Sequence, residues 1–278
     1  MVRMDSGMPC PAHALQQASS EVISTWLSTS FQAADPSFQG YCVAAMNGTG
    51  RTKADTGQDA TVWRNFFAAL TMQGRRGFYV DSGANHAQVL SNTHFFDRCL
   101  GWGGLCVEPN AAYHKALQEK RTCTLAPECI SWREEQVHMR LNGVLSKVGG
   151  NSGDLVQCRP LDAMLARASA PPRVDFWSMD LESYERIVIN ATDFEKTPVD
   201  VLLVEDVHLS NRELDRELMH KGFLKAMQLS SDALYVRRTA PVCWPKTFWL
   251  DPKYRWFWQK GVEYRKKLRA GGLLAKDL

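Results

Sequence analysis

The stretch Gly77-Phe-Tyr-Val-Asp81-Ser-Gly83-Ala-Asn85-His86-Ala87 decides the fold of this chain. A short apolar run ends in an acid, passes through a bend with a single glycine, and leads into helical spacing near 87–100, which is the pattern of a strand, a turn and a helix. In doubly wound sheets, ligands bind at the carboxyl ends of the strands, and a glycine there lets the backbone approach a ligand closely. We therefore expect a binding loop at the end of this first strand.

The composition of the loop indicates the kind of ligand. A dinucleotide fingerprint places three glycines against a pyrophosphate, whereas this loop has only Gly83, with Asp81 just before it. An acidic strand end repels pyrophosphate but suits the cationic sulfonium and amino group of S-adenosylmethionine. On its own the loop is only a weak indication of S-adenosylmethionine, and a nicotinamide-dependent oxidoreductase is the competing enzyme class.

Short apolar strands and helical stretches alternate along the rest of the chain. Alternation of this kind predicts parallel strands joined by right-handed crossovers, with helices on both faces of the sheet. Strands are expected at 78–81, 105–108, 122–125, 174–180, 201–205, 222–229 and 233–237, helices at 58–70, 110–120, 161–168, 182–191 and 212–220, and an inserted hairpin at 136–140 and 154–158. The last two strands form a hairpin, which separates methyltransferase sheets from dinucleotide-binding ones. The predicted fold class is α/β, a Rossmann-like class I methyltransferase sheet with a terminal antiparallel hairpin.

The second expected strand ends in Glu108, followed by Pro109 and Asn110. An acid at this strand tip accepts hydrogen bonds from the two hydroxyls of a ribose. One helix and one strand separate it from Gly83, as a site shared by neighbouring strands requires. The alternative interpretation is an exposed glutamate at a strand end.

Several motifs occur in the order found in one family. Gly57-Gln58-Asp59, the 77–87 stretch, Ser91-Asn92-Thr93 and Leu105-Cys-Val-Glu108-Pro109-Asn110 together resemble the FkbM methyltransferase family, in the branch with an S-N-T motif. Asp180-Leu-Glu182-Ser183-Tyr-Glu185 resembles its D-x-E-G-x-E element, and 201–205, 221–223 and 232–235 resemble its last strands. The resemblance covers roughly residues 57–238.

The resemblance implies the cofactor, its site and a class of acceptor. The cofactor would be S-adenosylmethionine, and the default acceptor would be a hydroxyl on a small molecule or sugar. The residues that would hold the cofactor are Asp81, Gly83, Asn85, Glu108, Pro109 and Asn110, with Gln58 and Asp59 near its methionine end. Ala87 and Ser183 stand where the family usually has glycine. These departures keep open a weakly active or inactive adaptor with the same fold.

Transfer to a hydroxyl requires a group that takes its proton. The candidates at the ends of the fourth and fifth strands are Asp180, Glu182, Glu205 and His208. We expect Asp180 or Glu182 to orient the acceptor, and His208 or Glu205 to take the proton. Glu182 could instead serve only as a helix N-terminal acid, and His208 could be a surface histidine. Nothing in the spacing of these residues demands a metal ion.

The bulk composition sets the remaining expectations. A chain of 278 residues with 45% hydrophobic and 23% charged residues is typical of a globular protein, and a net charge of +3 does not imply nucleic acid. Residues 1–20 do not resemble a signal peptide, and no apolar run approaches the ~18 residues of a membrane span, so a cytoplasmic location is expected by default. The eight cysteines follow no CxxC pattern and are expected to be mostly buried free thiols, with disulfides as the alternative.

Three regions are expected along the chain. Residues 1–57 form an irregular arm with one helix around 22–31, residues 58–238 form the methyltransferase domain, and residues 239–278 form a basic, aromatic extension that packs on it. The extension could alternatively contact an anionic substrate or stack on sugars. The oligomeric state is left open.

Overall fold

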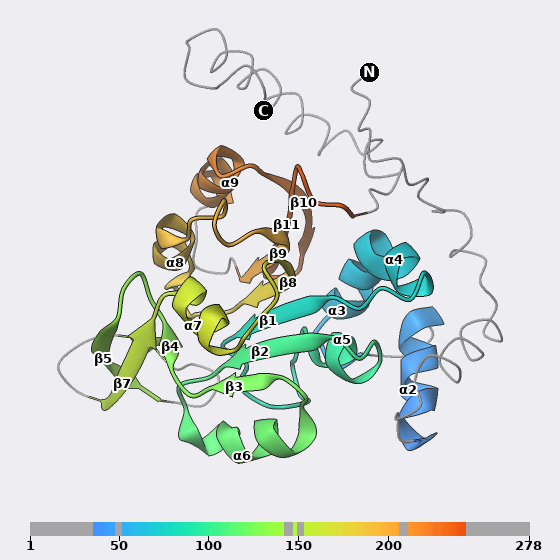
Figure 1. The fold of residues 1–278 in the computed structure, drawn as a ribbon, viewed down its shortest axis with the longest axis horizontal. Coiled ribbons are helices and arrows are strands. Elements are labelled where there is room, and N and C mark those ends of the chain that lie inside the picture. Colours follow the sequence, from blue (N-terminus) through green and yellow to red (C-terminus); the bar gives the residue numbers. More distant parts are fainter. Residues whose placement is uncertain (1–35, 48–51, 142–146, 149–152, 206–210, 243–278) are drawn as a thin grey trace, which may run out of the picture.

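A computed structural model of the chain describes residues 36–47, 52–141, 147–148, 153–205 and 211–242 (Figure 1). Seven strands form one sheet in the order β10-β11-β9-β8-β1-β2-β3. Their bounds are β1 (Phe78–Ser82), β2 (Gly103–Val107), β3 (Thr124–Ala126), β8 (Val174–Met179), β9 (Val199–Glu205), β10 (Phe223–Leu229) and β11 (Asp232–Arg237). The first five run parallel, and the β10–β11 hairpin joins β9 in antiparallel pairing. The predicted fold class is confirmed.

The order of the strands defines a switch point in the sheet. The chain runs outward from β1 through β2 to β3, and then crosses to β8 on the other side of β1. Crevices for ligands form at the carboxyl ends of strands where the order reverses in this way. The end of β1 is therefore the place in this fold where a cofactor site is expected.

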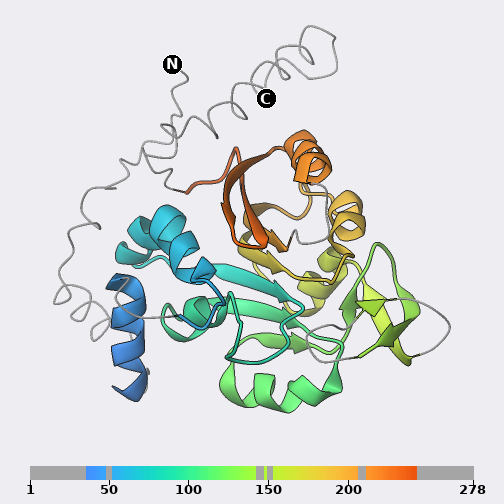
Figure 2. The same cartoon turned by 180° about the vertical axis from the view of Figure 1, so that it is seen from behind.

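Helices cover both faces of the sheet, because alternate strand residues point to opposite sides. Tyr79 packs into the hydrophobic core on one face and Val80 into the core on the other. The first face is covered by α2 (Pro36–Asn47), α3 (Gln58–Val62), η1 (Trp63–Phe67), α4 (Ala68–Met72), α5 (His94–Arg98) and α6 (Ala111–Lys120), and the second by α7 (Leu161–Arg167), α8 (Glu185–Ala191) and α9 (Asn211–His220). The opposite views of Figures 1 and 2 show α8 and α9 beside the β9–β11 end of the sheet.

Some helices differ from expectation. The helix predicted at 58–70 is present, but its middle turn, η1, has π geometry. The helix predicted near 87–100 is reduced to α5, because Leu90 has a left-handed φ of 58° and Ser91 Oγ accepts the amides of Thr93 and His94 in place of helical bonds. Helix α2 lies in the arm that was expected to be irregular. The helix expected around 22–31 and the extension from residue 243 onward lie outside the described residues.

The inserted hairpin is confirmed and belongs to a second, smaller sheet. Strands β5 (Glu135–Arg140) and β7 (Asp154–Arg159) pair antiparallel, and β4 (Cys129–Ile130) and β6 (Lys147–Val148) extend them to the order β4-β7-β5-β6. Figure 1 shows this sheet at one side of the main one.

The expectation of free thiols is wrong for the described cysteines. Disulfides join Cys42 to Cys99, Cys106 to Cys123, and Cys129 to Cys158. The partners are 17 to 57 residues apart in the sequence. No local spacing of cysteines therefore predicts the pairs, which the fold brings together. Disulfides persist mainly in oxidising compartments, which argues against the default cytoplasmic location. Within the described residues, no helix has the length and apolar character needed to cross a membrane.

The disulfides lead to a test by thiol labelling. After denaturation without a reductant, the cysteines of the three pairs should resist iodoacetamide, and after reduction each should gain one label by mass spectrometry. Replacing both Cys106 and Cys123 with Ala opens a 17-residue loop and should lower the free energy of unfolding by about 3 kcal/mol. Labelling of Cys106 and Cys123 before reduction would contradict the pairing.

Candidate functional site

The bend after β1 is built on Gly83. The amides of Gly83 and Ala84 both donate to the carbonyl oxygen of Val107, at 3.0 and 3.1 Å, so the bend folds over the end of β2. Gly83 has φ of 79°, and a Cβ atom at this position would lie 2.0 Å from the carbonyl oxygen of Asp180. Only glycine fits between the ends of β2 and β8 in this conformation.

Glu108 connects the loop after β1 with the residues that follow β2. Its Oε2 accepts the amide of Asn85 at 2.7 Å, and its Oε1 accepts the amide of Asn110 at 2.6 Å. The residue is only 4% exposed, and burial raises the pKa of its carboxyl group while the two amides oppose that shift. A single carboxylate therefore fixes the loop after β1 against the end of β2.

The neighbours of Glu108 have different parts in this arrangement. Asn110 is the N-cap of α6, because its Oδ1 accepts the amide of Ala112 at 3.0 Å. Pro109 lies half-buried between Glu108 and Asn110. The Oδ1 of Asn85 is buried and has no hydrogen-bond partner among the described residues. An orphaned acceptor beside the Gly83 bend fits a ligand that brings a hydrogen-bond donor.

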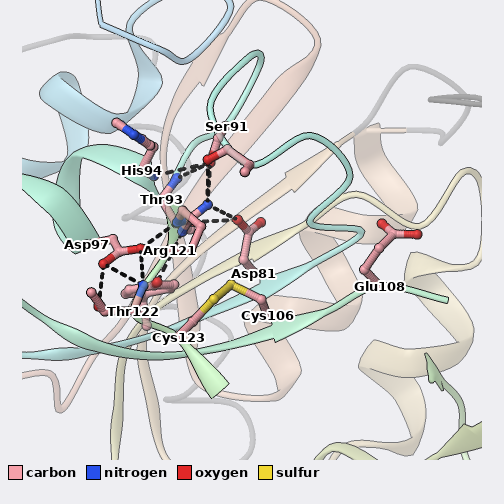
Figure 3. Close-up of a disulfide and its surroundings, with 12 residues drawn as sticks. Asp81, Ser91, Thr93, His94, Asp97, Cys106, Glu108, Arg121, Thr122 and Cys123 are labelled. Carbon is pink, nitrogen blue, oxygen red and sulfur yellow. Dashed lines mark hydrogen bonds and ion pairs between the residues drawn. A yellow bond between two sulfur atoms is a disulfide. The ribbon is translucent and has the colours of Figure 1, made fainter. Parts of the chain in front are cut away.

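Asp81 lies in a separate, buried cluster. Its Oδ2 accepts the hydroxyl of Thr93 at 2.5 Å and lies 3.6 Å from Nη1 of Arg121. Burial raises the pKa of Asp81, against the opposing charge of Arg121. Figure 3 shows Glu108 apart from this cluster. The structure thus places Asp81 beneath the loop, with one carboxylate oxygen already bonded to the protein.

The S-N-T motif, Ser91-Asn92-Thr93, connects the loop after β1 to three elements. Ser91 Oγ accepts amides at the start of α5, and Thr93 binds Asp81 of β1. Asn92 donates to Ser178 of β8 at 3.2 Å, and its own Oδ1 is buried without a partner in the described chain. Sequence reasoning noted the motif only as a mark of the family, and its contacts show that it holds the loop in place.

Gln58 and Asp59 lie at the start of α3 and are both buried. Gln58 Nε2 donates to Asp232 Oδ2 at 2.6 Å, and Asp232 pairs with Glu205 in the β11–β9 ladder. The helix is thereby tied to the carboxyl end of β9. Asp59 Oδ1 accepts the amide of Ala60, and burial raises the pKa of Asp59 to about 6. Asp232 was not expected in this region, since it starts a strand of mainly apolar residues.

Three of the four expected catalytic residues converge. The carboxylate oxygens of Asp180, Glu182 and Glu205 lie within 4.8 Å of one another, a grouping that could hold a metal ion. Strand continuation was expected to align Asp180 with Glu182, but β8 ends at Met179. A turn with left-handed φ at Glu182 and Ser183 aligns them instead. His208 lies outside the described residues.

Two further features shape this acidic group. Glu185, which is buried and was not expected in the site, accepts the amide of Leu181 at 2.7 Å and so supports the turn. The Asp180 residue is exposed, yet desolvation by the surrounding chain and, to a smaller extent, repulsion from Glu205 raise the pKa of its carboxyl group to about 9. At neutral pH one carboxyl of this group therefore holds a proton.

The turn at Ser183 provides a test of backbone conformation. Ser183 has φ of 81°, a conformation that costs an L-residue about 1–2 kcal/mol. Ser183→Gly should raise the free energy of unfolding in urea by roughly 0.5–1 kcal/mol, because the freedom of glycine in the unfolded chain cancels part of the gain. Ala87, the other departure from the family pattern, is buried without a positive φ. Ala87→Gly is therefore the control and should destabilise the protein, whereas equal effects of both variants would contradict this account.

The raised pKa of Asp180 predicts a dependence of stability on pH. The folded state binds this proton up to about pH 9, whereas the unfolded chain releases it near pH 4, so the carboxyl destabilises the fold increasingly as pH rises between these values. Asparagine resembles the protonated form. The melting temperature of Asp180→Asn relative to the wild type should thus increase from pH 5 to pH 9. A difference that is independent of pH would show that Asp180 ionises normally.

Comparison with known proteins identifies the family of this chain. Residues 81–225, just over half of the chain, match the methyltransferase FkbM domain. No curated protein matches the chain. Among solved structures, it is similar to the methyltransferase FkbM from Methylobacillus flagellatus KT, with 16% identity and a TM-score of 0.42 over 78% of this chain and 59% of that one. It is also similar to the precorrin-6y C5,15-methyltransferase from Geobacter metallireducens GS-15, with 14% identity and a TM-score of 0.34 over 60% of this chain and 84% of that one.

The chain thus spans less than two thirds of the length of its solved FkbM relative. The family match includes the Asp81–Asn85 bend, Glu108, and the acidic group at Asp180 and Glu205. The chain belongs to the methyltransferase FkbM family.

Proposed function

We propose that this protein transfers a methyl group from S-adenosylmethionine to a hydroxyl group of a small molecule or sugar. The observation that carries the proposal is the double hydrogen bond of Glu108 to the amides of Asn85 and Asn110, beside the Gly83 bend. It joins the two strand ends that a class I methyltransferase uses for its cofactor.

The residues at these strand ends fit the cofactor. Each oxygen of Glu108 accepts one amide and keeps a second lone pair, so the carboxylate can also accept the hydroxyls of a ribose. Asn85 offers an unpaired oxygen to a donor, and Gly83 leaves the loop without a side chain there. Pro109 and Asn110 follow the end of β2, and Asp81, whose charge is compensated by Arg121, lies next to the loop. The bound cofactor would supply an electrophilic methyl group, and its positive charge suits this acidic edge of the sheet.

The acidic group at the ends of β8 and β9 is the proposed acceptor side. The raised pKa of Asp180 favours its protonated form, which can donate a hydrogen bond to the acceptor oxygen but cannot take a proton from it. Glu205 or Glu182 would then accept the proton of the hydroxyl, a role that typically contributes about 10²–10⁴-fold to the rate. His208 remains the other proposed base. Gln58 and Asp59 lie near this acidic group, because Gln58 donates a hydrogen bond to Asp232, the strand partner of Glu205.

Calorimetry on the whole chain tests the cofactor site. The wild type should bind S-adenosylmethionine and S-adenosylhomocysteine but not NAD. Glu108→Gln should bind both about tenfold more weakly or worse, because the ribose hydroxyls lose a charged acceptor. The control is Glu119→Gln, an exposed acid on α6 that pairs with the exposed Lys115, and it should bind as the wild type does.

Other outcomes would overturn parts of the proposal. A chain that binds none of the three ligands would be an adaptor with this fold, and binding of NAD alone would indicate an oxidoreductase. Incubation with labelled S-adenosylmethionine and a cell extract should label a small molecule or sugar on oxygen. Label on nitrogen or carbon would contradict the O-directed part alone.

A further inference from the structure

The loop of residues 84–93 joins β1 to α5 and carries Asn85, yet helical or strand hydrogen bonds do not organise it. Side chains hold it instead. Glu108 accepts the amide of Asn85, His86 Nδ1 accepts the amides of Gln88 and Val89, and Ser91 Oγ accepts the amide of His94. The conformation of the loop is therefore only as rigid as the groups to which it is attached.

One of these groups is Arg121, the residue that follows α6. Its side chain is 0% exposed. All of its N–H groups are bonded, to Asp97 Oδ2, the carbonyl oxygen of Ala87, Ser91 Oγ, Tyr79 Oη and Thr93 Oγ1. Three of these five acceptors belong to loop 84–93, and Figure 3 shows two of them, Ser91 and Thr93, beside Arg121. A guanidinium can satisfy five acceptors at fixed angles, which no other side chain can do.

Arg121 also holds the buried carboxylate of Asp81 in place. Thr93 Oγ1 accepts from Arg121 and donates to Asp81 Oδ2, so the three groups form one chain of hydrogen bonds. The Arg121 Nη1 atom lies 3.6 Å from the same carboxylate oxygen. A buried carboxylate needs such a cation and donor to stay in place.

The backbone around Arg121 is itself fixed. The amide of Thr122 donates to Asp97 at 3.1 Å, and Cys123 is bonded to Cys106 of β2, two residues before Glu108. The guanidinium is thus anchored to the same strand that carries the proposed ribose acceptor. Little conformational freedom is left for Arg121 to lose when a ligand binds.

We infer that Arg121 is the positioning residue of the cofactor site, which holds loop 84–93 and Asp81 in the conformation that receives the adenosyl ligand. It acts through Ala87, Ser91 and Thr93 and not by contact with the ligand. This inference rests on the proposed binding of S-adenosylmethionine.

The test measures ligand affinity and loop protection in the same variants. Arg121→Lys keeps the charge but cannot bond five acceptors, and Thr93→Val keeps the shape but breaks the link to Asp81. Both should bind S-adenosylhomocysteine about tenfold more weakly or worse, the order expected for losing one hydrogen bond to a charged group. Amide hydrogen exchange should accelerate in residues 84–93 while β8 and β9 stay protected.

The matched control is Arg75→Lys. Arg75 pairs with Asp175 at 2.6 Å at the amino end of the same sheet, away from the loop. It should lower the melting temperature without changing affinity or exchange in the loop. If Arg121→Lys does not fold, Thr93→Val decides the matter.

The outcomes separate this inference from the function on which it rests. A wild type that does not bind S-adenosylhomocysteine overturns the proposed function and this inference together. A wild type that binds, with unchanged affinity in Arg121→Lys and Thr93→Val, overturns the inference alone. The same holds if the affinity falls equally in Arg75→Lys, because the effect would then be a general loss of stability.

Discussion

The structure of the site depends on one carboxylate that accepts two backbone amides. Glu108 draws the loop after β1 and the cap of α6 onto the end of β2, and it does so while almost fully buried. A buried carboxylate is costly unless it is hydrogen-bonded. Both of its bonds come from the chain itself, so the acceptor is in place before any ligand arrives. In a site that is arranged before the ligand binds, less binding free energy is lost to ordering side chains and loops.

The acidic residues at the carboxyl ends of the strands are likewise stabilised by groups of the chain itself. Asp81 is beneath the loop and is compensated by Arg121, whereas Asp180 and Glu205 lie close together at the ends of β8 and β9. The repulsion between them is relieved by a proton on Asp180. The edge therefore combines a neutralised acid under the loop with an acidic group beside it, and a sulfonium cation is the kind of ligand that such an edge favours.

The fold could be predicted from the sequence because it depends on short-range patterns. Buried strands such as Val199–Glu205 contain a short apolar run, here 201–204, and a parallel sheet with a closing hairpin follows from the order of these runs. Gly83 and Glu108 were also predictable, since each lies at the end of such a run. Asn85 and Glu108 lie close together because they follow β1 and β2, two neighbouring parallel strands whose carboxyl ends meet at the same edge of the sheet.

The remaining features depend on contacts that no local pattern encodes. Arg121 ends the polar run Gln118-Glu-Lys-Arg121, which is typical of a solvated helix end, and its position after the C-terminus of α6 places its side chain in the interior. The disulfide pairs and the tie from Gln58 to Asp232, 174 residues away, likewise exist only in the folded chain. Residues 87–93 of this loop were predicted as the start of a helix near 87–100, because apolar spacing does not reveal the side-chain acceptors at His86 and Ser91.

The two departures from the family pattern differ in physical meaning. A glycine can be replaced by alanine at low cost where φ is negative and the added methyl group finds room, and Ala87 meets both conditions in the core. Ser183 does not, because its φ of 81° is one that L-residues rarely adopt. The turn is nevertheless held, since Glu185 accepts amides from both Leu181 and Ser183. The strain is thus confined to the turn that brings Glu182 to Asp180 and Glu205, as is common for backbone strain at functional sites. An adaptor that needed only the fold would gain stability from glycine at this position and would have no use for the convergence of these carboxylates.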